Sequence, residues 1–449
     1  MSHLSLALLE PALAANFIER ETTLMDRGLS LLGIVVMIAI AWALSEARRD
    51  VKWRPVAWGV ALQLLFGFIV LMPALQDFFF VVVDNGVHKL LSFSEAGAEF
   101  VFQSIEPHQI LQDGQEVTFR GRISPPVKTF AFWILPTIVF FSALMSVLYH
   151  LGIMQPLVKG IAWLMQRTMG TSGAESLAAA SNVFVGQTEA PLVVRPYVDS
   201  MTRSELHALM CGGFATVAGG VMAAYVGFLD SIPGIAGHLV TASIMSAPAA
   251  LAVSKVMVPE LHVPRTMGSV PMLPRTQGNV LEACANGAAD GMKLALNVAA
   301  MLIAFVGMVA MVDWVLSWII VGGDPLSMSR MLGWLFTPIA LAMGVPWEEA
   351  PIVGMLLGEK IVLTEFIAYI HLGEIVNSEV PMLSERSAII ASYGLCGFAN
   401  FASIGIQLGG IGGIAPARMK DLASLALRAM IAGSLAAFMT GTVAGVILG

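Results

Sequence analysis

The sequence predicts an all-α polytopic membrane protein with eight transmembrane helices and two opposed re-entrant hairpins, arranged as an inverted repeat with broken helices. Apolar residues make up 57% of the 449 residues and charged residues only 12%, about half the charge of a soluble domain. A polar signature also occurs twice. Thr188-Glu189 is followed by Gly-Phe-Ala-Thr-Val-Ala at 213–218, and Thr364-Glu365 is followed by the similar Gly-Phe-Ala-Asn-Phe-Ala at 397–402. Carboxylates in apolar stretches are costly, and matched pairs in two halves are typical of a duplicated transporter core.

Eight apolar stretches are long enough to be spans, although the first is near the lower length limit. They are residues 29–44, 55–73, 130–151, 205–229, 236–257, 280–320, 386–410 and 422–448. Polar residues and glycines interrupt 205–229 and 386–410, and the freed backbone groups must face protein or a cavity. Residues 155–168 predict an interfacial helix.

Two other apolar segments, 173–198 and 343–372, are broken in the middle at Thr188-Glu189 and at Thr364-Glu365. Each half is too short to cross a bilayer, so both segments predict re-entrant hairpins. Basic loops at 48–54 and 258–280, the latter with Arg265 and Arg275, belong in the cytoplasm by the positive-inside rule. This orientation puts both chain ends outside and makes the two hairpins enter from opposite faces.

These elements divide the chain into five parts. We expect an N-terminal tail at 1–28, membrane helices at 29–151 with an external insertion at 74–128, a first core repeat at 152–258, a cytoplasmic loop and long scaffold helix at 259–342, and a second core repeat at 343–449.

Composition and motifs exclude several function classes. The net charge of −7 gives no basic surface for nucleic acid. The sequence has no metalloprotease helix motif, nucleophile elbow or phosphate loop, so we expect no enzyme and no catalytic residues. The three cysteines, Cys211, Cys284 and Cys396, lie in apolar context without metal-ligand spacing, and we interpret them as small core residues.

Polar side chains gather at the hairpin tips and at the breaks of the interrupted spans. The first half supplies Gln187, Thr188, Glu189 and Thr216, and the second supplies Thr364, Glu365, Phe398, Asn400 and Ser403. Carboxylates accept hydrogen bonds from hydroxyls, amides pair with a planar polar ring, and phenylalanine offers a stacking face. The set suits a small uncharged solute with several hydroxyls and a planar, amide-bearing ring.

Structural roles compete with this interpretation. Asn400 alone would serve as a hydrogen-bonding link between helices, and Phe398 alone as core packing. Lys360 and Arg195 lie on the hairpin arms, where we expect their heads to reach the membrane interface. Glu282, Asp290 and Lys293 open the long helix and are expected at a polar interface or an assembly contact.

At these residues the chain resembles the concentrative nucleoside transporter family. The resemblance rests on four motifs in order: Asn182-Val-Phe-Val-Gly-Gln-Thr-Glu-Ala-Pro-Leu192, Gly344-Val-Pro-Trp-Glu-Glu-Ala350, Gly358-Glu-Lys-Ile-Val-Leu-Thr-Glu-Phe-Ile-Ala-Tyr369 and Leu395-Cys-Gly-Phe-Ala-Asn-Phe-Ala-Ser403. It covers residues 130–449 and, more loosely, 29–75.

The resemblance implies a multi-pass homotrimer in a bacterial inner membrane, in contact with lipid, that takes up nucleosides by an elevator-like movement driven by a cation gradient. By the same resemblance, Gln187, Thr188 and Glu189 face the nucleobase, Val221 and Phe398 pack on it, and Glu365, Asn400 and Ser403 bind the ribose hydroxyls.

The resemblance also implies a sodium site for the coupling ion, at Asn182, Val185, Thr216 and Val217. Side-chain oxygens and carbonyls of broken helices suit a hard cation. Asn182 favours Na+ because family members thought to use protons have serine there. A proton-coupled transporter, with Glu189 or Glu365 titrating, is the alternative.

The chain departs from the family at Thr364, where asparagine is usual, so substrate preference or coupling is open. A nucleoside-binding receptor that does not transport is therefore a rival from another class. Gly186 beside Gln187 leaves room near the base and suggests that purines are accepted along with pyrimidines.

Overall fold

A computed structural model describes residues 16–71, 73–102, 108–112, 115–119, 129–268 and 278–448. Predictions for residues 1–15, for part of the 74–128 insertion and for Arg275 lie outside these ranges.

The described chain is almost entirely helical. In order, its helices are α1 (Leu24–Ala43), α2 (Trp53–Leu71), α3 (Pro73–Phe102), α4 (Leu135–His150), α5 (Met154–Met169), α6 (Gly173–Asn182), α7 (Ala190–Val193), α8 (Arg195–Val198), α9 (Arg203–Ala215), α10 (Gly219–Phe228), α11 (Ile235–Met257), α12 (Val280–Leu316), α13 (Met328–Ala342), α14 (Ala350–Val362), α15 (Glu365–Val376), α16 (Glu385–Leu395), α17 (Phe401–Ile414) and α18 (Met419–Ile447). Two short antiparallel pairs join β1 (His108–Gln112) to β2 (Gln115–Phe119) and β3 (Ile320–Val321) to β4 (Asp324–Pro325).

Seven helical segments of the described chain are long and apolar enough to cross a membrane, which confirms a helical polytopic fold. They match seven of the eight predicted spans and include both halves of the first interrupted one, Arg203–Phe228. The eighth predicted span, 386–410, is divided into α16 and α17, and neither part reaches spanning length.

Two sets of helices have the same order. In the first, α6 leads through a turn into α7 and α8, and the broken pair α9–α10 follows. In the second, α14 leads into α15, and the broken pair α16–α17 follows. In each set the first hairpin helix packs on the first half of the broken pair, α6 on α9 and α14 on α16. We call these sets the first and second repeats.

The helix α9 illustrates how local sequence sets these boundaries. Thr202 caps it by accepting from the Glu205 backbone N–H, and the Glu205 carboxylate accepts in return from the Thr202 backbone. Its other end is the break at Thr216, whose backbone is extended. The predicted interruption therefore lies where expected.

Several elements were not anticipated. The helix α13, capped by Ser327, lies along α14 and follows a long helix that ends at Leu316 rather than near residue 320. The second arm of the first hairpin is two short helices, α7 and α8, each with a proline in its first turn. A further helix, α3, lies at the start of the predicted insertion, for which the sequence already indicated some helix, and it packs against α4 and α11.

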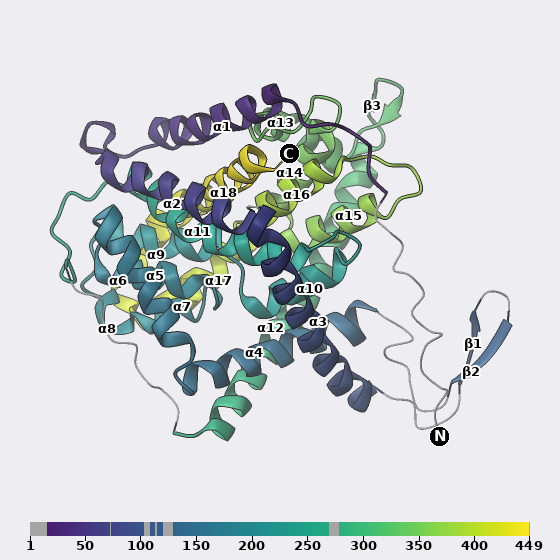
Figure 1. Cartoon of the computed structure of the whole chain (residues 1–449), viewed down its shortest axis with the longest axis horizontal. Coiled ribbons are helices and arrows are strands. Elements are labelled where there is room, and N and C mark those ends of the chain that lie inside the picture. Colours follow the sequence, from purple (N-terminus) through teal and green to yellow (C-terminus); the bar gives the residue numbers. More distant parts are fainter. Residues whose placement is uncertain are drawn as a thin grey trace.

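The helices α4 and α12 pack along each other (Figure 1), and α12 also contacts α13. The backbones of α4 and α12 approach closely because α12 presents glycine: a Cβ at Gly287 would lie 2.6 Å from the Ser146 Cβ. Most of α12 is exposed, whereas α9, α11 and α18 are buried in the core.

The loop between α1 and α2 is tied to the core by charge. Arg203 donates two hydrogen bonds to the Glu46 carboxylate, at 3.2 and 2.9 Å, and Arg428 lies 3.4 Å from it. These bonds from Arg203 hold the pKa of the Glu46 carboxyl below its usual value.

Candidate functional site

The two broken pairs meet at their breaks. Gly397 has a φ of +130°, and a Cβ there would lie 2.7 Å from the Phe214 carbonyl oxygen in the last turn of α9. Glycine is therefore required both for the backbone conformation and for the contact. This contact sets the break of the second repeat directly against the break of the first.

A cavity of about 90 Å³ lies beside the breaks, between the two hairpin tips. All eight residues predicted to bind substrate line it: Gln187, Thr188, Glu189, Val221, Glu365, Phe398, Asn400 and Ser403. The structure thus brings together residues from the first hairpin, α10, the second hairpin and α17. No lysine or arginine is among the described residues that line it.

Glu365 is fixed from two sides. The Tyr225 hydroxyl donates to one carboxylate oxygen at 2.9 Å, and the Asn400 amide donates to the other at 2.7 Å. Asn400 is itself fixed because its side-chain oxygen caps α17 by accepting from the Ser403 backbone N–H. The carboxylate is buried but lines the cavity, so its remaining lone pairs can accept from hydroxyl groups of a solute.

Gln187, which also lines the cavity, links the two repeats. Its amide donates to the Ser403 hydroxyl at 3.2 Å, and its carbonyl oxygen accepts from the Gln407 amide at 3.1 Å. Gln407 also donates to the Met210 carbonyl in α9. Thr188 and Glu189, the next residues of the tip, are exposed.

Sequence reasoning missed several residues of this cavity. Leu294, Val298 and Leu302 of α12 close one side of it. Their spacing is that of one helix face, a signal visible in the sequence, but nothing there indicates which helix the face meets. Tyr225 was missed because an aromatic residue in an apolar helix gives no sign of its partner.

The predicted cation residues lie together behind the first hairpin. Asn182 ends α6 and is 1% exposed, yet neither polar atom of its amide has a hydrogen-bond partner. It lies against α9, since a Cβ at Gly212 would come within 3.1 Å of its nitrogen. Thr216 and Val217 occupy the α9 break beside it, and Val185 is half-buried at the turn after α6. A buried amide with two unsatisfied atoms can take a water or an ion as its partner.

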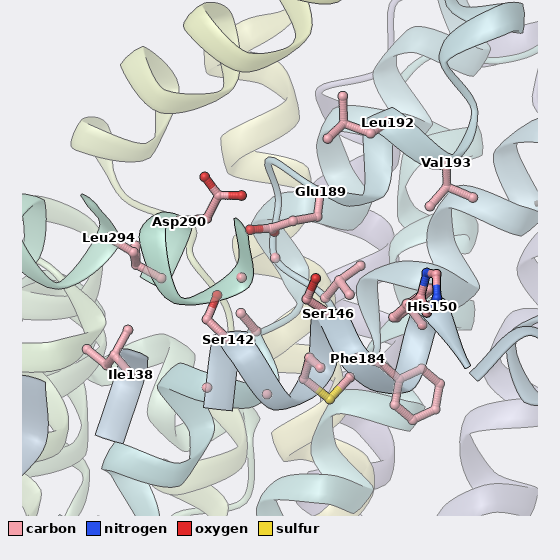
Figure 2. A pocket seen from close by; sticks show the side chains of 18 of the residues that line it. Ile138, Ser142, Ser146, His150, Phe184, Glu189, Leu192, Val193, Asp290 and Leu294 are labelled. Carbon is pink, nitrogen blue, oxygen red and sulfur yellow. The ribbon is translucent and has the colours of Figure 1, made fainter. Parts of the chain in front are cut away.

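A larger cavity of about 230 Å³ lies on the other side of the first hairpin tip (Figure 2). It shares Gly186, Glu189, Ala218 and Leu294 with the smaller cavity. Figure 2 shows Glu189 from the tip and Asp290 from α12 on the same side of this space. Asp290, expected at an interface, therefore lies in the wall of this cavity, on the same side as the first hairpin tip.

Two expectations were wrong. Cys284, which we interpreted as a small core residue, is exposed on α12, whereas Cys211 and Cys396 are buried. Lys360 does not reach the membrane interface: its side chain is fully buried, and its ammonium donates to the Gly394 carbonyl at 2.9 Å. Its position on a hairpin arm suggested an exposed head, but packing of α14 on α16 encloses it. Arg195, on the other hairpin, is exposed.

Thr364 lines the smaller cavity with a buried hydroxyl that has no hydrogen-bond partner. The departure from the family's asparagine is thus at the cavity wall, where its hydroxyl is available to a ligand.

Comparison with known proteins places these features in a family. Three family models match successive regions: Na+ dependent nucleoside transporter N-terminus at residues 32–105, nucleoside recognition ("Gate") at 131–232, and Na+ dependent nucleoside transporter C-terminus at 238–445.

Curated relatives match along nearly the whole chain. An uncharacterized transporter of Haemophilus influenzae is 42% identical, over 94% of this chain and 97% of that protein. Solute carrier family 28 member 3 of Rattus norvegicus is 42% identical over 92% of this chain, and sodium/nucleoside cotransporter 1 of the same species is 40% identical over 93%. The chain spans 58% and 63% of the lengths of these two rat proteins.

A solved structure of CNTnw in an inward-facing substrate-bound state matches this fold with a TM-score of 0.83 and 39% identity, over 94% of this chain and 98% of that one. The resemblance drawn from the four motifs is therefore confirmed: the chain belongs to the concentrative nucleoside transporter family, a family of transporters and not of enzymes.

Proposed function

We propose that this protein is a secondary active symporter that takes up nucleosides together with a sodium ion across a bacterial inner membrane. The observation that carries the proposal is the small cavity, which joins carboxylate, amide, hydroxyl and phenyl groups from both repeats around one space. The cavity wall holds no cationic side chain among the described residues, which suits an uncharged solute better than a nucleotide.

The two ends of the cavity have different chemistry. Glu365, Asn400 and Ser403 offer acceptors and a hydroxyl to the ribose. Gln187, Thr188 and Glu189 offer a flat amide and a carboxylate to the base edge, with Val221 and Phe398 against the ring face. A Cβ at Gly186 would lie 2.6 Å from a Glu189 oxygen, so glycine there keeps the tip compact and leaves room for purine as well as pyrimidine bases.

Sodium binds, in this proposal, behind the first hairpin tip at Asn182, Val185, Thr216 and Val217. The two unpartnered atoms of Asn182 support this location, because a cation would take the amide oxygen and backbone carbonyls of the broken α9. The ion would order the tip that presents Gln187 to the base, so nucleoside binds more tightly when sodium is present.

The proposed architecture has eight spans, with α16 and α17 together forming the interrupted one, and two re-entrant hairpins that enter from opposite faces. The protein assembles as a homotrimer through its scaffold. Support comes from α12, which exposes large apolar side chains along its length, including Leu281, Leu296, Ile303 and Met311.

Transport follows from movement of the hairpins and broken helices past α4 and α12. Leu294 of α12 lines both cavities, and Glu189 of the tip faces both. The larger cavity is thus the next space that a nucleoside meets when the tip moves, and it forms the release path.

The test is uridine uptake into proteoliposomes of the purified protein under an inward sodium gradient, an inward proton gradient, or neither. Accumulation above equilibrium with sodium alone is expected. Accumulation with protons alone would keep the substrate but transfer coupling to Glu189 or Glu365. Uridine binding without accumulation under either gradient would favour a receptor.

A further inference from the structure

The two repeats differ in a polar side chain on the first helix of the hairpin. In both repeats, the hairpin's first helix directs a polar side chain at the last turn of the neighbouring half-helix. In the first repeat this side chain is Asn182, which lies against Gly212 of α9 and lacks hydrogen-bond partners. In the second it is Lys360, whose ammonium donates to Gly394 in the last turn of α16.

The environment of Lys360 is unusual for a buried charge. Its ammonium is 5.6 Å from the centroid of the Phe438 ring, and no described carboxylate lies within 4.0 Å of it. Lys255, also buried, instead contacts Glu175 at 2.7 Å and Glu260 at 3.4 Å. An ammonium without a direct counter-ion is costly in the interior, so other features must offset it.

Two features offset this charge. The carbonyl end of α16 carries partial negative charge and unpaired oxygens where the helix stops at Leu395. The face of the Phe438 ring also attracts the ammonium. Lys360 precedes Glu365 by five residues and Gly394 precedes Asn400 by six, so their hydrogen bond links the second hairpin to the break of the second repeat.

We propose that Lys360 is a tethered cation, the second repeat's counterpart of the sodium ion in the first repeat, and that it positions Glu365 and Asn400 for the ribose. The inference rests on the proposed sodium-coupled function and deepens it. It follows that only the first repeat takes an ion from solution, so one sodium ion binds with each nucleoside. Lys360 is a positioning residue, because it touches neither cavity.

The test compares Lys360→Gln with Lys360→Arg in the purified full-length protein. Uridine affinity is measured at saturating sodium, and sodium binding is measured without uridine by the shift in melting temperature. Lys159→Gln, at an exposed lysine of α5, is the matched control. For the wild type, sodium dependence with a Hill coefficient of about one is expected.

Lys360→Gln should weaken uridine binding about tenfold while sodium binding without uridine stays within about twofold of wild type. Lys360→Arg, which keeps the charge, should recover most of the uridine affinity. A purely structural lysine would impair both ligands together. If only the Gln variant fails to fold, a folded Arg variant that binds uridine supports the proposed role of the positive charge at position 360.

Three outcomes would overturn the inference: uridine affinity unchanged in Lys360→Gln, sodium and uridine binding lost in parallel, or both variants failing to fold. A wild-type Hill coefficient near two would refute the single ion. Wild-type protein that binds no uridine would instead refute the proposed function, and the inference with it.

Discussion

The two repeats share one motif and one order of helices but differ in how their tips are held. In the second repeat Glu365 is fixed by Tyr225 and Asn400. In the first repeat Thr188 and Glu189 are exposed at the tip, and Asn182 behind them has no hydrogen-bond partner. The second repeat is thus preorganised, as the proposed ribose site requires, and the first repeat is less constrained, as the proposed base and sodium sites require.

The largest expected effect is at the fixed carboxylate. Glu365→Gln should lower uridine affinity about a hundredfold, about 2.7 kcal/mol, and abolish uptake. Glutamine has one acceptor where two donors converge, and Asn400 cannot turn because its oxygen caps α17. Asn400→Ala should abolish uptake as well. Equilibrium binding and proteoliposome uptake measure both variants, and wild-type transport by either one would show that the ribose assignment is wrong.

At the first repeat, Asn182→Ala should weaken sodium binding, so that more sodium is needed for uptake. Removing the amide oxygen takes a ligand from the proposed ion site, so the sodium concentration for half-maximal uridine uptake should rise roughly twentyfold. Uridine affinity at saturating sodium should change little. A sodium response equal to that of wild type would locate the ion elsewhere.

Tyr225→Phe tests the second repeat alone, because it removes one hydrogen bond to Glu365 and leaves the carboxylate in place. Loss of the 2.9 Å hydrogen bond to Glu365 should cost about 1.5 kcal/mol, or about tenfold in uridine affinity. Stacking of the ring on Tyr369, with centroids 4.1 Å apart, should preserve the fold. An analogue without ribose hydroxyls should show no such loss, and an equal loss for both ligands would contradict a role in sugar binding.

A smaller effect is expected at Thr364. Thr364→Val keeps the shape but removes the unpartnered hydroxyl from the cavity wall, which should reduce uridine affinity about threefold if that hydroxyl meets the substrate. Competition binding with several nucleosides checks this. No change for any of them would assign Thr364 to packing alone.

The smallest effect lies outside the repeats' tips. Glu46→Gln should lower stability at pH 7 by about 0.5–1 kcal/mol, since it removes contacts with Arg203 and Arg428. The folded pKa of Glu46 is depressed, so its contribution is present above the unfolded pKa and disappears as pH falls below about 4. Melting temperatures of mutant and wild type should therefore converge in acid, and a constant difference would contradict the ion-pair explanation.

The sequence was most informative where polar groups interrupt apolar runs. The breaks at Thr216 and Asn400, and the polar cavity residues, could be located because a polar or glycine-rich interruption in an apolar run has few structural uses. Val221 came only from the family resemblance. The resemblance then gave each residue a role, and those roles remain predictions.

Features that depend on packing between distant segments could not be predicted. Tyr225 and Lys360 each lie in ordinary helical context, and only the packing of α10 and α14 against other elements defines their partners. The helix α13 was not predicted, although serine at position 327 is a typical N-cap residue. The preceding long helix was predicted to extend to residue 320, whereas it ends at Leu316. The residues of α12 that line the cavity could be identified only from the fold, which shows the face of this helix that meets the two repeats.

In the proposed division of roles, the second repeat recognises the sugar and the first recognises the base and the ion. Its most direct test compares the binding of two ligands to two proteins. Uridine and 2′,3′-dideoxyuridine, which lacks the 2′- and 3′-hydroxyls of the ribose, are titrated at saturating sodium into wild type and Asn400→Ala. Wild type should prefer uridine by at least roughly tenfold, and the variant should bind the two ligands about equally. If Asn400→Ala discriminates as strongly as wild type, the second repeat does not recognise the sugar, and the division of roles is contradicted.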